Sequence, residues 1–357
     1  MRFIRKTSYA QDIDLFKHNG QRFWYGLLAL AVLLAPLALD RFLLGEMALV
    51  YIYAIAGVGL MLLVGYTGQV SLGHAAFLAI GAYCHAWLLN QGWPFPLALA
   101  AATGFSGAVG IAVGIPALRM TGIYLAVATL AFLVIVEQVL SHWVSVTGGF
   151  RGMPVPRAEL GIDLSAPVAF YYLCLLALFA SMVAALNWLR SPTGRAMAAV
   201  RDSETSAESM GIHIAYTKTL AFGISAAFTG LAGALFAHKI GYLAPDAFTL
   251  ATSIQLLLMV VVGGLGSMHG VIYGAIFIGL LPQGIALLRD AAPPAVSQIP
   301  GLEAGVFGLI LVLFLIYEPD GLYGRWRKIR LFFEEFPLYR RATYKRQRSY
   351  LRTERLR

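Results

Sequence analysis

Two glycine-rich strings interrupt the apolar sequence of this chain and bring small polar side chains into it. The first, "GYTGQVSLGHAAFLAIGAY", spans residues 65–83, and the second, "GGLGSMHG", spans residues 263–270. Glycine weakens a helix by about 1 kcal/mol relative to alanine. Non-helical backbone at membrane depth is tolerated where protein buries it or where it lines a water-filled cavity. The strings therefore predict broken or re-entrant helices beside a path for a solute, or alternatively tight turns whose small residues allow close helix packing.

Each string combines clustered glycines with a serine and a histidine, and paired glycine-interrupted segments are a feature of transporters built from repeats. A carboxylate inside an apolar segment is a functional hypothesis by default, which adds Glu137, although its place near a segment end also fits the membrane interface. No series of acidic residues runs through several apolar segments, as a proton-coupled carrier often needs. The residues predicted to line a path are Gly65, Gly68, Gln69, Ser71, Gly73, His74, Glu137, Gly263, Gly264, Gly266 and Ser267.

A further glycine pair lies in "TGGFRGM", residues 147–153. Adjacent glycines give the backbone freedom, and an arginine guanidinium binds carboxylates. The residues predicted to contact a substrate or an external partner are Thr147, Gly148, Gly149 and Arg151. The alternative is a plain loop.

One stretch, "RSPTGRAMAAVRDSETSAESMGIHIAYTK" at residues 190–218, has the composition of a soluble protein, with four basic and three acidic side chains. Thr193 and Asp202 are predicted to be helix N-caps, and Gly211 is predicted to stop a helix. Two short helices are therefore expected between Thr193 and Gly211.

The second of these helices is predicted to carry Ala207 and Met210 on one face, since they are three residues apart. A helix this short is marginal in water, so we expect it to dock into a groove on a partner with Met210 as an apolar anchor. A loop without a partner is the alternative. The residues assigned to this contact are Arg195, Arg201, Asp202, Ala207, Glu208, Met210 and Gly211.

The composition of the chain indicates the class of protein to which these residues belong. Apolar residues make up 59% of the chain, charged residues 13%, and the mean hydropathy is +0.72, whereas soluble proteins have about 25% charged residues. Ten apolar segments of roughly spanning length lie at about 23–39, 47–65, 75–92, 96–118, 122–142, 167–189, 219–240, 251–264, 269–288 and 304–318. They show no alternation of period two, which excludes a barrel. We predict an all-α polytopic membrane protein with about 8–10 transmembrane helices.

The basic residues predict the orientation of the chain. With both termini in the cytoplasm, 22 of the 27 Lys and Arg residues lie on the cytoplasmic side, as the positive-inside rule requires. The net charge of +9 is thus a signal of orientation and gives no support for nucleic-acid binding. Lys239, His85, His142 and His238 lie near segment ends, where they are predicted to reach the interface. The predicted parts are a basic cytoplasmic segment at 1–22, a transmembrane domain at 23–318 with the cytoplasmic stretch 190–218, and a basic cytoplasmic tail at 319–357.

The start of the tail, "GRWRKIR" at 324–330, has aromatic and aliphatic residues among basic ones. It is predicted to lie on the inner lipid surface, where each basic residue contributes about 1 kcal/mol. The alternative is a solvated tail that only fixes the topology.

Several chemistries are absent from the sequence. No G-x-x-x-x-G-K-[ST] string occurs, so the chain is not expected to bind ATP through a P-loop. No nucleophile, base and orienting group stand at a recognisable spacing, and no C-x-x-C motif suggests a metal or redox site. Cys84 and Cys174 are predicted to be small buried hydrophobes. We expect a transport subunit without a metal or a cofactor of its own rather than an enzyme.

Four stretches together resemble a known family. These are "GYTGQVSLGHAAFLAIGAY", "TGGFRGM", "AVRDSETSAESMGIHIAYTKTLAFGISAAFTGLAGALFA" and "VVVGGLGSMHGVIYGAIFIGLLPQ". They resemble, in order and spacing, the permease subunits of ABC importers for branched-chain amino acids, and more closely the M-type permease of the leucine/isoleucine/valine system. The resemblance covers most of residues 45–325, while the basic tail beyond about 330 looks longer than the usual ending of the family.

The resemblance implies a fold, partners and a role for the charged stretch. Such permeases pair with a second, homologous permease in the bacterial inner membrane, on two ATPase subunits that hold ATP and Mg²⁺, and an external binding protein delivers the substrate. The family contacts its ATPases through a cytoplasmic loop with an Ala-rich helix that ends in Gly. Arg195–Gly211 matches that loop, with Ala207, Glu208 and Gly211 at the matching positions. Related permeases carry urea or short amides.

Two other classes of function remain open at this point. An autonomous channel or secondary carrier would move solute without ATP, and it would favour ionisable residues along several spans. A membrane scaffold for a cytoplasmic complex would leave the two glycine strings without a purpose.

Overall fold

The computed structural model describes residues 19–118, 120, 122–157, 166–290, 302–318 and 320–335. Ten helices occupy the ten apolar segments: α2 (Asn19–Ala38), α3 (Arg41–Leu60), α4 (His74–Asn90), α5 (Phe95–Ala117), α6 (Ile123–His142), α8 (Pro167–Arg190), α11 (Ile214–Ile240), α12 (Leu250–Gly263), α13 (Met268–Asp290) and α15 (Leu302–Tyr317). Within the described part of the chain, 7 helical stretches are long and apolar enough to cross a membrane. The predicted all-α polytopic membrane fold is confirmed.

The short segment at 251–264 belongs to a longer apolar stretch. The 14-residue helix α12 follows the 3₁₀ turn η3 (Pro245–Ala247). Together, Pro245–Gly263 is 19 residues long and apolar enough to span a membrane.

The chain divides into two compact units. The larger unit is Ala35–Tyr323, and the smaller unit combines Met1–Leu34 with Gly324–Arg357. Both glycine strings and the charged stretch belong to the larger unit. The helix α16 (Gly321–Glu335) begins in the larger unit and has most of its length in the smaller one.

Helix α11 forms the centre of the larger unit and packs on α3, α4 and α5. Lipid offers no hydrophobic force that drives helices together, so small residues at close contacts supply the packing energy instead. A Cβ atom on Gly233 would overlap the carbonyl oxygen of Leu78 in α4, and one on Gly81 would overlap the backbone of Gly230. The most apolar stretch of α11 is accordingly 72% buried inside the protein.

A small β-ribbon closes one end of this bundle. The chain leaves α6 through α7 (Val144–Thr147), η2 (Gly149–Arg151) and β1 (Met153–Pro154). Strand β1 pairs antiparallel with β2 (Tyr242–Leu243), with Met153 opposite Leu243.

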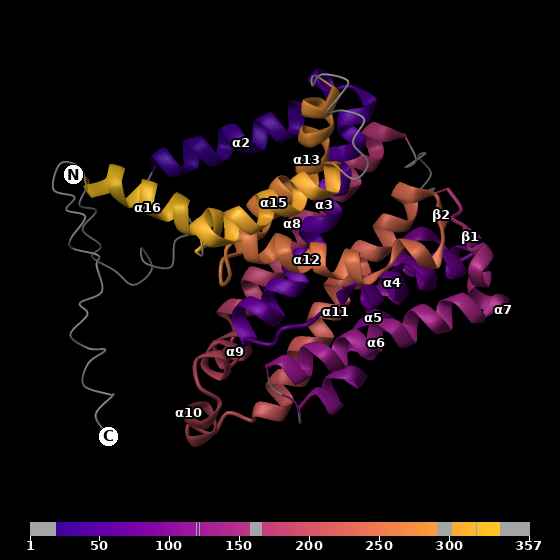
Figure 1. Cartoon of the computed structure of the whole chain (residues 1–357), viewed down its shortest axis with the longest axis horizontal. Helices are drawn as coiled ribbons and strands as arrows, with labels where there is room; N and C mark the ends of the chain where they lie inside the picture. Colours follow the sequence, from indigo (N-terminus) through magenta and orange to yellow (C-terminus); the bar gives the residue numbers. More distant parts are fainter. Residues whose placement is uncertain are drawn as a thin grey trace. The chain divides into compact units, whose positions relative to one another are not determined.

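The charged stretch lies at the other end of α11. It forms two short helices, α9 (Pro192–Asp202) and α10 (Glu204–Ser209), which precede α11, whereas β2 follows it (Figure 1). The 27 residues of α11 separate the two ends by about 40 Å.

The contact at Gly233 gives a first prediction. Gly233→Ala should lower the melting temperature of the detergent-solubilised chain, because forced overpacking costs about 1–3 kcal/mol and the backbone of α4 has no room to give. The matched control is Gly104→Ala in α5, where nothing lies within 4 Å of an added Cβ. Gly104→Ala should leave the melting temperature unchanged or raise it slightly, since alanine favours a helix. Equal melting temperatures for the two variants would contradict the packing described for α11.

Candidate functional site

Residues 68–73 of the first glycine string are non-helical backbone between α3 and α4. Helix α3 ends in a π-helical turn, η1 (Met61–Gly65), and Gly68 has a φ of +74°. The chain then extends until α4 begins at His74. Along the way the N–H of Leu72 donates to Thr129 Oγ1 of α6 at 2.9 Å. The string is thus a helix interruption inside the bundle, as the broken-helix interpretation requires, and its role in a path stays a prediction.

His74 fixes the inner end of this string. Its imidazole is fully buried, with Nδ1 2.9 Å from Ser71 Oγ and Nε2 2.8 Å from Ser225 Oγ in α11. Ser225 lies eleven residues after the start of α11, which is about 16 Å along its axis. Both ring nitrogens therefore have a hydroxyl partner, and in this conformation His74 pins α4 to α11.

Gln69 differs from its neighbours in the string. Its side chain is 5% exposed, and its Oε1 is a buried oxygen without a hydrogen-bond partner among the described residues. A buried acceptor left unpaired costs about 1–3 kcal/mol. Gln69 can therefore gain a hydrogen bond from a rearrangement of the string.

The second glycine string is a tight turn between α12 and α13. Gly264 and Gly266 have positive φ values of +113° and +80°, and Ser267 Oγ accepts from the N–H of Gly270 at 3.3 Å. Its histidine, His269, is exposed and stacks on Tyr323 with ring centroids 6.0 Å apart. The two strings therefore share glycines and a capping serine, but their histidines have different surroundings.

The structure brings the two strings together. The N–H of Gly266 points to Met61 Sδ at 3.3 Å, and a Cβ on Gly65 would lie 2.9 Å from the nitrogen of Gly266. Any larger residue at position 65 would push the two strings apart.

Arg201, in the last turn of α9, joins both strings to the charged stretch. Its Nη1 donates to the carbonyl oxygen of Gly65 at 3.0 Å, while Nε and Nη2 donate to Asp202 Oδ1 at 3.0 and 2.9 Å. A Cβ on Gly68 would lie 3.2 Å from Arg201 Cγ, and one on Gly266 would lie 3.5 Å from Nη1. Arg201 therefore hydrogen-bonds the first glycine string and lies beside the second.

Helix α9 is seated on the bundle. Met197 and Val200 are 0% and 2% exposed, and Met197 packs in an apolar cluster with Leu63, Ala117, Leu125, Ala221 and Phe222. These residues come from η1, α5, α6 and α11. Helix α9 thus moves with the bundle rather than as a free loop.

The N-caps predicted at Thr193 and Asp202 are wrong. Ser191 caps α9 by accepting from the N–H of Gly194, and Ser203 caps α10 by accepting from Ser206, both at 3.3 Å. Pro192 occupies the first helical position of α9, where proline is favoured, so the cap precedes it.

The end of α10 confirms one expectation and overturns another. Gly211 has a φ of +81°, so the predicted helix stop is confirmed. Ala207 is 3% exposed whereas Met210 is 86% exposed, so they do not share a docking face. The reason is that α10 ends at Ser209, which leaves Met210 past its last turn. An ion pair of 2.7 Å between Glu204 and Lys218 of α11 holds the helix to the bundle.

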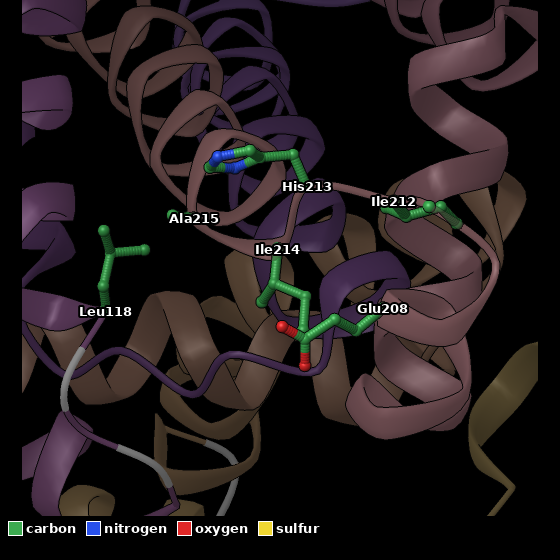
Figure 2. Close-up of a pocket in the computed structure, with 7 residues that line it drawn as sticks. Leu118, Glu208, Ile212, His213, Ile214 and Ala215 are labelled. Carbon is green, nitrogen blue, oxygen red and sulfur yellow. The ribbon is translucent and has the colours of Figure 1, made fainter.

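A hollow of about 460 Å³ lies where the ends of α5 and α10 meet the start of α11 (Figure 2). It is lined by the end of α5, the end of α10 and the start of α11, through Leu118, Glu208, Gly211, Ile212, His213, Ile214 and Ala215. Arg195 lies apart from it on α9, where its Nη1 donates to the carbonyl oxygen of Arg190 at 2.9 Å. An exposed methionine beside a hollow with one carboxylate is the chemistry of an adaptable docking surface.

At the ribbon end, the residues predicted to contact a substrate or an external partner differ in their exposure. Thr147 is 3% exposed, and its hydroxyl lies 2.6 Å from the carbonyl oxygen of Leu140. Gly148 and Gly149 have φ values of +76° and +60°, so they shape the turn. Thr147 and the buried Gly149 are therefore structural, because their groups face the protein. Arg151 is exposed and stays a predicted contact.

Glu137 is half-buried in the outer part of α6. No hydrogen bond or ion pair to its carboxylate occurs within the described residues. Its predicted role in a path stays a prediction.

Sequence reasoning missed two polar clusters between helices. Lys239 Nζ lies 3.8 Å from Glu46 Oε1, and Gln283 Nε2 donates to Glu46 Oε2 at 3.2 Å. His85 and His238 share a contact of 2.9 Å between their Nε2 atoms. Lys239, His85 and His238 thus each have a side-chain partner on another helix, and their predicted position at the interface stays a prediction. The sequence feature that could have revealed the first cluster is Glu46, a carboxylate at the start of an apolar segment.

Comparison with known proteins gives a consistent result. Residues 42–315 match the family described as branched-chain amino acid transport system / permease component. LivM of Escherichia coli K12, a high-affinity branched-chain amino acid transport system permease protein, is 37% identical over 327 residues, which cover 84% of this chain and 74% of LivM.

Two further relatives extend this comparison. LivM of Salmonella typhimurium LT2 is 37% identical over 76% of this chain and 67% of its own length. LsrC of Escherichia coli O9:H4, an autoinducer 2 import system permease protein, is 28% identical over 85% of this chain and 88% of LsrC. No solved structure matches the chain.

Proposed function

Because this chain belongs to the permease-component family of branched-chain amino acid transport systems, we propose that it is the transmembrane permease subunit of an ATP-driven importer of branched-chain amino acids. The observation that carries the coupling part of this proposal is the junction at Arg201, which ties the exposed α9–α10 segment to both glycine strings. A force that a partner protein applies to this segment is transmitted through Arg201 to the helix interruptions inside the bundle.

The proposed importer has further subunits. The 357 residues contain no P-loop string, so ATP and Mg²⁺ belong on two partner ATPase subunits. A second, homologous permease completes the membrane part, and an external binding protein delivers the substrate. Membership of the family and the docking chemistry around Met210 support these partners.

The proposed coupling runs through α10. Met210 anchors an ATPase surface, and the hollow beside it receives a side chain of that surface. Closure of the ATPase pair pushes on α10, and the push passes through the Glu204–Lys218 ion pair to α11 and through Arg201 to the glycine strings. ATP shifts the equilibrium between outside-open and inside-open states only if the contacts differ between those states. The unpaired oxygen of Gln69 is such a differential contact.

This mechanism sets the orientation in the membrane. The α9–α10 segment faces the cytoplasm, and the ribbon of β1 and β2 faces the outside of the bacterial inner membrane. Both chain termini are then cytoplasmic, in agreement with the distribution of Lys and Arg. Arg151 and the exposed Phe150, at 71% exposure, are placed to meet the binding protein.

The substrate proposal is a branched-chain amino acid, with an apolar side chain and a zwitterionic backbone. Aliphatic helix faces suit the first part, and the interrupted helix ends, with their partial charges, suit the second. The alternative substrate is urea, an amide or another small solute. The similarity to LsrC, which is named for a different solute, keeps this alternative open.

Purification and reconstitution test the proposal. The tagged chain, extracted in mild detergent from its native membrane, should co-purify with P-loop ATPases and a second permease. Liposomes that hold this complex and the binding protein should accumulate labelled leucine with ATP inside. Leucine flux through the chain alone, without ATP, would show an autonomous carrier instead.

Met210 gives the sharpest test of the docking surface. Met210→Asp should reduce leucine uptake and ATPase co-purification by at least tenfold, because loss of an interface anchor costs about 2 kcal/mol or more. Met210→Leu is the matched control, since it keeps an apolar side chain of similar size, and it should retain uptake. Membrane insertion and melting temperature should stay unchanged in both, as Met210 is exposed. Normal uptake with Met210→Asp would remove this residue from the coupling.

A further inference from the structure

Helix α16 follows closely on α15, which covers the last segment that the sequence predicts to cross the membrane. Three residues separate the end of α15 at Tyr317 from the start of α16 at Gly321, and such a link spans about 10 Å at most. The headgroup region on each side of a bilayer is roughly 5–8 Å thick. The first turn of α16 therefore lies within reach of lipid headgroups.

The turn before α16 is held in place. Gly321 has a φ of +71°, and a Cβ there would lie 2.6 Å from the Cα of Gly264. Two residues on, the Tyr323 ring stacks on His269 with an interplanar angle of 12°. The start of α16 is thus attached to the second glycine string, so the helix has no freedom to begin far from the membrane surface.

The sequence of α16 separates into two faces. Leu322, Trp326, Ile329 and Phe333 recur at a helical spacing and form one apolar stripe. The last three side chains are 51%, 42% and 75% exposed. This is a continuous apolar stripe, and the rest of the helix surface carries basic residues together with Leu331 and Phe332.

Basic residues surround this stripe. The four cationic side chains of α16 are Arg325, Arg327, Lys328 and Arg330, all exposed. No acidic residue occurs between Gly321 and Phe333. A helix with a tryptophan and phenylalanine stripe, a cationic face and low net hydrophobicity is the type that lies in the plane of a membrane interface.

We propose that α16 is an interfacial helix that binds anionic phospholipid headgroups. The stripe of Leu322, Trp326, Ile329 and Phe333 enters the boundary between headgroups and acyl chains, and the cationic side chains contact lipid phosphates. The occupant is lipid rather than a protein groove because the helix begins within headgroup distance and all charged residues from Gly321 to Phe333 are basic, complementary to an anionic surface. The inference does not depend on which solute the chain carries.

Spin labelling in nanodiscs tests the orientation of α16. The full chain carries Cys84→Ala and Cys174→Ala, with one new cysteine at Ile329 on the stripe or, as the matched control, at Leu331 on the opposite side. In nanodiscs with 30 mol% phosphatidylglycerol, the label at position 329 should be accessible to oxygen and shielded from a water-soluble nickel chelate. The label at 331 should show the reverse. Equal accessibilities at the two positions would overturn the proposal.

A second measurement needs no cysteine change and tests the preference for anionic lipid. Brominated phosphatidylglycerol should quench Trp326, read as the difference between the unsubstituted chain and Trp326→Phe. Arg327→Gln should raise the lipid fraction at half-maximal quenching about fivefold, since each basic residue near an anionic surface contributes about that factor. Brominated phosphatidylcholine that quenches as strongly as phosphatidylglycerol, or an unchanged midpoint for Arg327→Gln, would refute recognition of anionic headgroups.

Discussion

Direct backbone contact between helices at glycine is the constraint on which this structure depends. Lipid does not push helices together, so the bundle is stabilised where α11 has no side chain between itself and α4, as at Gly233 and Gly230. These contacts bring Ser225 of α11 next to His74. A close bundle is in turn what allows polar, non-helical backbone inside the membrane, because every freed group must find a partner in protein.

The same constraint links the interior to the surface. The two glycine strings touch at Gly65 and Gly266, which leaves a carbonyl oxygen for Arg201 to bind. Helix α9 carries this guanidinium and is itself buried through Met197. A displacement of the α9–α10 segment therefore changes hydrogen bonds at the helix interruptions, without a long chain of intermediate contacts. Such a short route fits the proposed coupling to ATPase subunits on other chains.

Much of the fold, but less of the site, could be predicted from the sequence. Segment length and apolarity place the helices, and Gly211 signals a helix stop because a left-handed residue is needed there. The sequence does not show which side chains of different helices contact each other. The contacts between His85 and His238, 153 positions apart, and between Glu46 and Lys239 depend on how helices are rotated, which composition does not encode. The spacing of three residues predicts Ala207 and Met210 on one face, which is wrong because α10 ends at Ser209, before Met210.

The most direct test of the account is the Arg201→Gln variant in the assembled importer, with ATP hydrolysis and leucine uptake measured on the same vesicles. Glutamine keeps a polar side chain but loses the forked guanidinium that reaches Gly65 and Asp202 together. The account predicts that ATP hydrolysis persists while uptake falls at least tenfold, since the ATPase surface at Met210 is intact and its link to the glycine strings is broken. Uptake that stays in proportion to hydrolysis would contradict it, and the coupling would then run through α11 alone.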